Sequence, residues 1–152
     1  MKAAQVLIVG YGNPLRGDDA LGRLAASRLA QRFAGLPRVT VMEVHQLTLD
    51  LAEAVNGCEL LILLDARQAS PAGKLFCAPV APATAAPNPF VHYCTPGELL
   101  AATALLYGSA PRAFLAGITA TGFNVGAPLS PEVAAALDDL AQLVADLVEE
   151  TQ

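Results

Sequence analysis

Short apolar runs alternate along the chain with segments in which apolar residues recur at helical spacing. Residues 5–9, 39–44 and 60–64 are apolar or β-branched, and each run predicts a strand. Residues 19–33 and 49–55 follow the first two runs and have the spacing or composition of helices. Residues 60–64 include no polar side chain, which is typical of a parallel strand buried on both faces. The first half of the chain thus predicts two strand–helix units and a third strand.

The second half adds two strands and two helices. Residues 68–73 carry Ser, Pro and Gly and are too few for a crossover helix, so residues 74–80 are expected to return as an antiparallel strand. Thr95-Pro96-Gly97-Glu98 combines an N-cap, a first-turn proline and an acid, which predicts a helix start. Residues 113–119 predict another strand, and Ser130-Pro131-Glu132 opens a final helix with one apolar face.

This order of elements predicts an α/β fold, a three-layer α/β/α sandwich around a mixed, mostly parallel five-stranded sheet. Residues 1–152 are expected to form one domain, because the length is typical of one and no repeat or linker interrupts the pattern. Right-handed crossovers place the first strand between the second and the third, where the chain reverses direction across the sheet. Ligands bind at the carboxyl ends of the strands beside such a point, here the crevice between Gly10 and Asp65.

Composition and charge narrow the range of partners and compartments. With 54% hydrophobic and 15% charged residues the chain is not disordered, and its formal net charge of -5 gives no attraction for nucleic acid or anionic lipid. The apolar run before Gly10 is too short for a signal peptide, and no stretch reaches the ~18 apolar residues that span a bilayer. The expected compartment is the cytoplasm. Cys58, Cys77 and Cys94 form no CxxC pair, so they are expected to be buried free thiols.

The most specific signal is GYGNPLRGDDALG at residues 10–22, between the first strand and the first helix. A dinucleotide-binding loop would need a small residue where Leu15 stands and would use the amide that Pro14 lacks. The adjacent acids Asp18 and Asp19 would also repel a pyrophosphate. These two acids can instead cap the helix, and a capping role can coexist with a ligand role on the other acid.

At these residues the chain resembles the hydrogenase maturation proteases. The hallmark of that family is a strand leading into G-x-G-N-x-L-x-x-D-(D/E)-(A/G)-(I/L/V)-G, and residues 10–22 match it at every fixed position. The resemblance extends to Asp65, to HYCTPGELL at residues 92–100 and to LSPEV at residues 129–133. It therefore covers nearly the whole chain.

The resemblance implies an endopeptidase, aspartic-type and nickel-dependent, that removes the C-terminal extension of a nickel-iron hydrogenase large-subunit precursor after nickel insertion. It implies that Asp19, Asp65 and His92 are metal ligands and that Asp19 and Asp65 are catalytic. The metal is expected to be the nickel of the precursor, with zinc as the other candidate. Many relatives have Glu where this chain has Asp19, which shortens the reach to the metal by one methylene. The enzyme is expected to be a monomer.

The predicted topology supports the same three residues independently. Asp19 follows the first strand and Asp65 the third, so both carboxylates should lie at one end of the sheet, although Asp65 can also be only a solvated loop start. Residues 81–91 must return from the far end of the antiparallel strand, and an extended segment of that length spans about 35 Å, enough to bring His92 to the same end. His45 follows the second strand and is the competing histidine. Two carboxylates and an imidazole suit nickel or zinc and leave open positions.

Other functions compete for the same residues. Cys94 stands two residues after His92, a spacing that rarely aligns a nucleophile with its base. The sequence contains no G-x-S-x-G or H-E-x-x-H motif, which argues against a serine hydrolase and a zincin. The alternative class is a non-catalytic binding module, either nucleotide-binding or an assembly factor that holds the immature subunit. The sequence leaves open which hydrogenase is the partner, and whether the metal acts in the chemistry or only in recognition, with Asp19 or Asp65 as general base.

Overall fold

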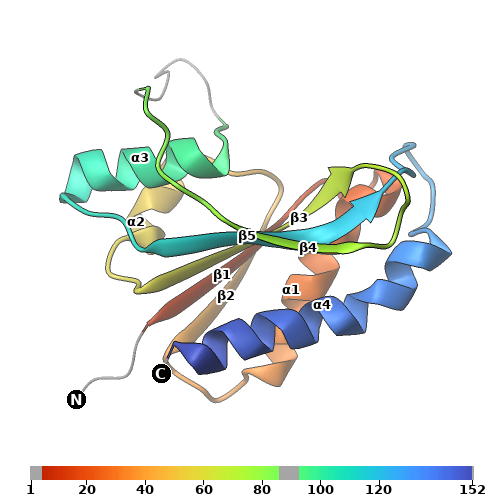
Figure 1. Ribbon diagram of the computed structural model, residues 1–152, viewed down its shortest axis with the longest axis horizontal. Helices are drawn as coiled ribbons and strands as arrows, with labels where there is room; N and C mark the ends of the chain where they lie inside the picture. Colours follow the sequence, from red (N-terminus) through yellow and green to blue (C-terminus); the bar gives the residue numbers. More distant parts are fainter. Residues whose placement is uncertain (1–4, 86–92, 152) are drawn as a thin grey trace.

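The computed structural model describes residues 5–85 and 93–151, which form a five-stranded sheet with helices on both faces (Figure 1). The strands are β1 (Val6–Tyr11), β2 (Val39–Val44), β3 (Leu60–Gln68), β4 (Leu75–Pro79) and β5 (Arg112–Ala120). The helices are α1 (Leu21–Arg32), α2 (Ala52–Val55), α3 (Pro96–Tyr107) and α4 (Pro131–Glu150), with 3-10 turns η1 (Gly17–Ala20) and η2 (Leu49–Leu51).

The strand order is β2-β1-β3-β5-β4, with β4 antiparallel to β5 and the other neighbours parallel. The first strand lies between the second and the third, as the crossover rule predicts. The predicted α/β/α sandwich and the antiparallel return of the fourth strand are therefore confirmed.

The apolar run of β3 is explained by burial on both faces. Leu60, Ile62 and Leu64 pack in the core that α1 and α4 cover, whereas Leu61 and Leu63 pack in the core that α2 and α3 cover. All five side chains are at most 1% exposed. Burial of each contributes about 2 to 3 kcal/mol, so an alternating polar pattern is not tolerated here.

The two helical layers do not cover the sheet equally. Figure 1 shows α2 and α3 together over one part of their face, while the carboxyl ends of β3 and β5 extend well beyond them. The capping box that starts α3 is formed as predicted: Glu98 N donates to Thr95 Oγ1 at 3.2 Å, and Thr95 N donates to Glu98 Oε1 at 3.0 Å. In the part of the chain that the structure describes, no helix is both long and apolar enough to cross a membrane.

Two predicted boundaries are wrong. The third strand was expected to end at Leu64, but it continues through Asp65 to Gln68, because β5 pairs with it as far as Gln68 and Ala120. Pairing with β1 stops at Leu64, so Asp65 lies within a strand that has lost one neighbour. The first helix was expected to start at Asp19, but η1 intervenes and α1 begins two residues later.

The cysteines are free, as predicted, but they are not all buried. Cys58 and Cys94 are partly buried, and Cys77 is exposed. The prediction failed for Cys77 because β4 is an edge strand, and edge strands have only one neighbour to cover them.

Candidate active site

A cavity of about 270 Å³ opens at the carboxyl ends of β1, β2 and β3. It is lined by Tyr11, Gly12, Asn13, Arg16, Asp19, His45, Gln46 and Asp65. The two carboxylates that the topology predicted to meet therefore share one cavity. Hollows of about 310 and 410 Å³ lie elsewhere, the first almost wholly apolar and the second beside α4, and neither is lined by these acids.

The glycine-rich turn holds Asp19 by close backbone contact. Asn13 N donates to Asp19 Oδ2 at 2.7 Å. Gly12 has a φ of +144°, and a Cβ there would lie 2.0 Å from the Asp19 carbonyl oxygen. A Cβ on Gly10 would lie 2.1 Å from the Gly22 carbonyl oxygen. The glycines of the motif are therefore required so that η1 and α1 can approach the end of β1.

Asp65 lies in a setting that opposes its ionisation. Burial raises its pKa to about 6, the negative charge of Asp19 adds to the rise, and hydrogen bonds from Ala66 N and the Tyr11 hydroxyl lower it only in part. Ala66 N donates to Asp65 Oδ1 at 2.7 Å. Burial and the charge of Asp65 also raise the pKa of Tyr11, so this phenol stays protonated and donates. Perturbed carboxyl groups of this kind are typical of functional sites.

Asp18 has a role that the sequence did not indicate. It is fully buried and accepts hydrogen bonds from Ser130 N at 2.7 Å, Ser130 Oγ at 2.9 Å and Gly122 N at 3.2 Å. Its own amide donates to Gly122 O at 2.8 Å. The prediction that Asp18 or Asp19 caps the helix is wrong, since no side chain caps η1 or α1. Asp18 instead fastens the loop before α4 to the glycine-rich turn.

Of the two candidate histidine ligands, the structure describes His45 only. His45 lines the cavity, and its carbonyl accepts from Gly12 N at 3.1 Å. His92 lies outside the described residues. Tyr93, the next residue, forms an antiparallel bridge with Thr48, so the chain has returned to this end of the sheet by that point. Among residues 5–85 and 93–151, no three His, Cys, Asp or Glu side chains form a group that could hold a metal ion. In this arrangement His45 lines the cavity but is not grouped with Asp19 and Asp65 as a metal site.

Cys94 is poorly suited to act as a nucleophile. Burial, with smaller contributions from Glu98 and Asp50, raises its pKa to about 11. The thiol is therefore almost entirely protonated at neutral pH, and the thiolate is the reactive form.

The sequence matches no protein-family model, and no curated protein sequence is significantly similar to it. Solved structures do match. The hydrogenase maturating endopeptidase HybD from E. coli is 21% identical, with a TM-score of 0.78 over 96% of this chain and 93% of that one. The NiFe hydrogenase maturation protease HycI from Thermococcus kodakarensis is 22% identical, with a TM-score of 0.74 and the same coverage, 96% and 93%. HybD from Thermococcus kodakarensis is 22% identical, with a TM-score of 0.71 over 95% and 99% of the two chains. This chain therefore has the fold of the hydrogenase maturation proteases.

Proposed function

We propose that the chain is an endopeptidase that removes the C-terminal extension of a nickel-iron hydrogenase large-subunit precursor after nickel insertion. The observation that carries the proposal is that Asp19 and Asp65, from separate strand–loop segments, line one cavity at the switch point of the sheet. The similar structures that are named as hydrogenase maturation proteases support the same activity. The enzyme acts as a monomer in the cytoplasm under this proposal.

In this proposal Asp19, Asp65 and His92 bind the nickel of the precursor. The donor set fits a borderline divalent ion, and the like charges of the two carboxylates favour a cation between them. Three protein ligands hold such an ion weakly, since structural metal sites usually have four ligands. We therefore expect the purified enzyme to contain less than one metal ion per chain, because the precursor supplies the remaining ligands.

Peptide hydrolysis needs a polarised carbonyl and a base that takes a proton from water. A divalent ion held by these residues would supply Lewis acidity to the scissile carbonyl. One of the two carboxylates, Asp19 or Asp65, takes a proton from the attacking water and passes it to the amide nitrogen that leaves as the C–N bond breaks, and the Tyr11 hydroxyl orients Asp65. Asn13 N fixes one oxygen of Asp19, and Asp19 lines the cavity.

The nucleotide-binding alternative is disfavoured by the hydrogen bonds of the glycine-rich turn. A phosphate loop must offer free amides. Here Gly12 N donates to His45 O, Asn13 N to Asp19, and Asp18 N to Gly122 O. Leu15 N donates to Asn13 Oδ1 at 2.9 Å. These amides of the turn are therefore already used by acceptors within the protein.

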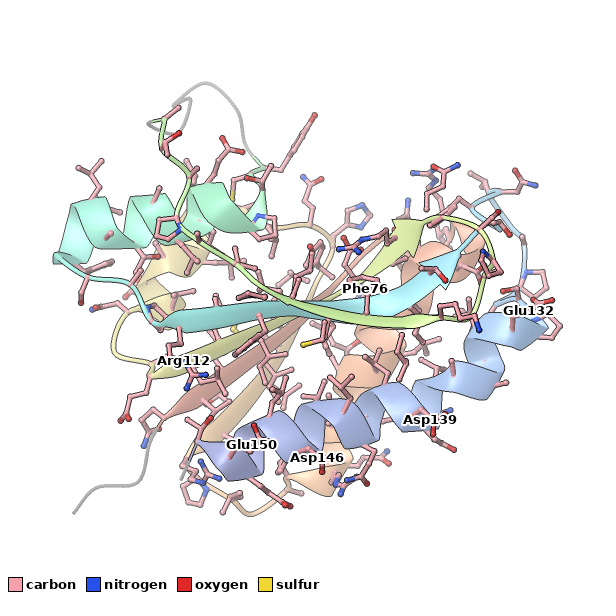
Figure 2. All side chains as sticks on the ribbon, viewed as in Figure 1. Phe76, Arg112, Glu132, Asp139, Asp146 and Glu150 are labelled. Carbon is pink, nitrogen blue, oxygen red and sulfur yellow. The ribbon has the colours of Figure 1, made fainter. Side chains whose placement is uncertain are left out.

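The proposal is tested by incubating the protein with nickel-loaded and with nickel-free precursor and weighing the large subunit by mass spectrometry. We expect loss of the extension only from the nickel-loaded precursor. Asp19→Asn and Asp65→Asn should each lower the rate by at least about 100-fold. Asp139→Asn, which removes an exposed acid of α4 (Figure 2), is the matched control and should leave the rate unchanged.

Three results would contradict the proposal: a stable complex without cleavage, no interaction, or equal cleavage of both precursors. The roles of His92 and His45 are distinguished by calorimetric titration of nickel into the complex of the enzyme with the nickel-free precursor. His92→Ala should weaken nickel binding more than His45→Ala does. The reverse order would show that His45 is the ligand.

A further inference from the structure

No helix of the described residues covers one face of the sheet immediately beside the cavity (Figure 1). Side chains alternate along β3, and Leu61 and Leu63 face α2 and α3, so Asp65 and Arg67 point to that same face. The two helices end before this point, and the strands continue beyond them (Figure 1). Arg67 lies about 7 Å along the strand from Asp65 and is exposed. The residue next to the candidate catalytic acid on this surface is thus a cation.

Arg67 is held in place by an aromatic ring. Gly117 pairs with Asp65 on one side and with Phe76 of β4 on the other. Because Gly117 has no side chain, the Phe76 ring fills the space above it, and its Cζ lies 2.7 Å from where a Cβ would be. The Arg67 guanidinium carbon lies 3.9 Å from the centre of this ring. The stack holds the guanidinium over Phe76 of the edge strand β4.

Within residues 5–85 and 93–151, no carboxylate forms an ion pair with the Arg67 guanidinium. The ion pairs among the described residues are Arg23 with Glu43 and Arg28 with Asp138, and neither involves Arg67. A stacked arginine keeps its donors in a planar fork that matches a carboxylate. In a chain of net charge -5, an ordered arginine without an acidic partner beside a hydrolytic cavity is best explained by a ligand.

We propose that Arg67, stacked on Phe76, is a specificity residue that binds a carboxylate of the extension that is cleaved off. The proposal rests on the proposed function. The cavity of about 270 Å³ holds only the residues next to the scissile bond, so the extension must leave across an adjoining surface. The uncovered face from Asp65 toward β4 is such a surface. Every extension ends in an α-carboxylate, and an acidic side chain would present the same group.

The test compares cleavage of three nickel-loaded precursors by the wild type and by Arg67→Gln. The first precursor has its native extension. In the second, every Asp and Glu of the extension is replaced by its amide. In the third, the extension is prolonged by Gly-Ser-Gly-Ser-Gly, which moves the α-carboxylate away. We expect Arg67→Gln to lower kcat/KM for the native precursor about tenfold, mainly through KM, as for loss of one charge-assisted bond.

That loss should disappear on the second precursor if the ligand is an acidic side chain, or on the third if it is the C-terminus. Arg67→Lys keeps the charge without the planar fork and should retain part of the activity. The matched control is Arg112→Gln, because Arg112 is likewise exposed and lies 5.6 Å from the Phe114 ring, but at the opposite end of β5 (Figure 2). Its kcat/KM should equal that of the wild type.

The proposal is overturned if Arg67→Gln cleaves all three precursors like the wild type, or loses the same factor on all three. It is also overturned if Arg16→Gln, at the cavity wall, shows the selective loss instead. Equal thermal unfolding midpoints of the variants exclude a folding defect. If the wild type cleaves the precursors but Arg67→Gln shows no selective loss, only this inference is refuted. If the wild type does not cleave, the proposed function is refuted.

Discussion

Replacing Asp65 by asparagine should make the metal-free protein more stable at neutral pH. The change removes the charge and preserves the shape, and the amide oxygen can still accept from Ala66 N. The pKa of Asp65 is raised from 3.8 to about 6 in the folded protein, mainly by burial. A difference of this size corresponds to at most about 3 kcal/mol of lost stability once the group is ionised.

The sign follows from proton binding. Between pH 4 and pH 6 the folded protein holds the Asp65 proton and the unfolded chain has released it, so the ionisation of this group lowers stability as the pH rises. This loss of stability is complete at pH values above the pKa of Asp65 in the folded protein, and it is absent at pH values below the pKa of Asp65 in the unfolded chain. Asp65→Asn should therefore be about 2 to 3 kcal/mol more stable than the wild type at pH 7.5, and equal to it near pH 3.

The measurement is urea denaturation at several pH values with a chelator present, followed by circular dichroism. Asp139→Asn removes an exposed acid and should stay within about 0.5 kcal/mol of the wild type throughout. The reasoning fails if Asp65→Asn is destabilising at pH 7.5, or if its advantage does not shrink as the pH falls. Either result would mean that the hydrogen bonds to the carboxylate outweigh its burial.

Three further predictions concern the surroundings of the site. Asp18→Ala leaves the partly buried Ser130 and Gly122 amides without an acceptor and should cost about 3 to 5 kcal/mol in urea denaturation, whereas Ser130→Ala should cost only about 1 to 2 kcal/mol. Gly117→Ala should cost more than about 2 kcal/mol in the same assay, because its Cβ would lie 1.8 Å from the Asp65 carbonyl oxygen. Cys94→Ser should keep most of the cleavage rate in the mass-spectrometric assay, and complete loss with an intact fold would indicate a cysteine nucleophile.

The sheet was predictable because each strand contains a local signal. The run Leu60–Leu64 is apolar at every position, and this uninterrupted run predicted a strand buried on both faces. The continuation through Asp65 to Gln68 has no such signal, since these residues are polar or small. They are strand only because β5 extends alongside, a contact between segments far apart in the sequence. The residue at which a strand ends depends on how far its neighbouring strands extend, and the sequence of the strand itself does not contain this information.

The site was predictable in its position and less so in its detail. Asp19 and Asp65 were placed together by topology, and they line one cavity. Local composition does not distinguish the two adjacent acids, and only the family resemblance selected Asp19. The role of Asp18 depends on Ser130, which lies 112 positions away. Ser130 occupies the N-cap position of α4, as the predicted helix start requires, but its hydroxyl donates to Asp18 and not to the helix. A short polar side chain near a helix start has several partners within reach, and tertiary contacts choose among them.

The glycine-rich motif is long because most of its positions build the turn rather than act in the cavity. Gly12 permits close backbone contact between the turn and Asp19. The backbone amide of Asn13 donates to the Asp19 carboxylate, and the side-chain oxygen of Asn13 accepts from Leu15 N. Asp18 points away from the cavity and anchors the loop before α4. Of the two acids in the motif, Asp19 alone lines the cavity, and its partner Asp65 comes from a strand outside the motif. A match to this motif therefore predicts the geometry of the turn strongly, whereas the chemistry depends on which acid the neighbouring strand places opposite it.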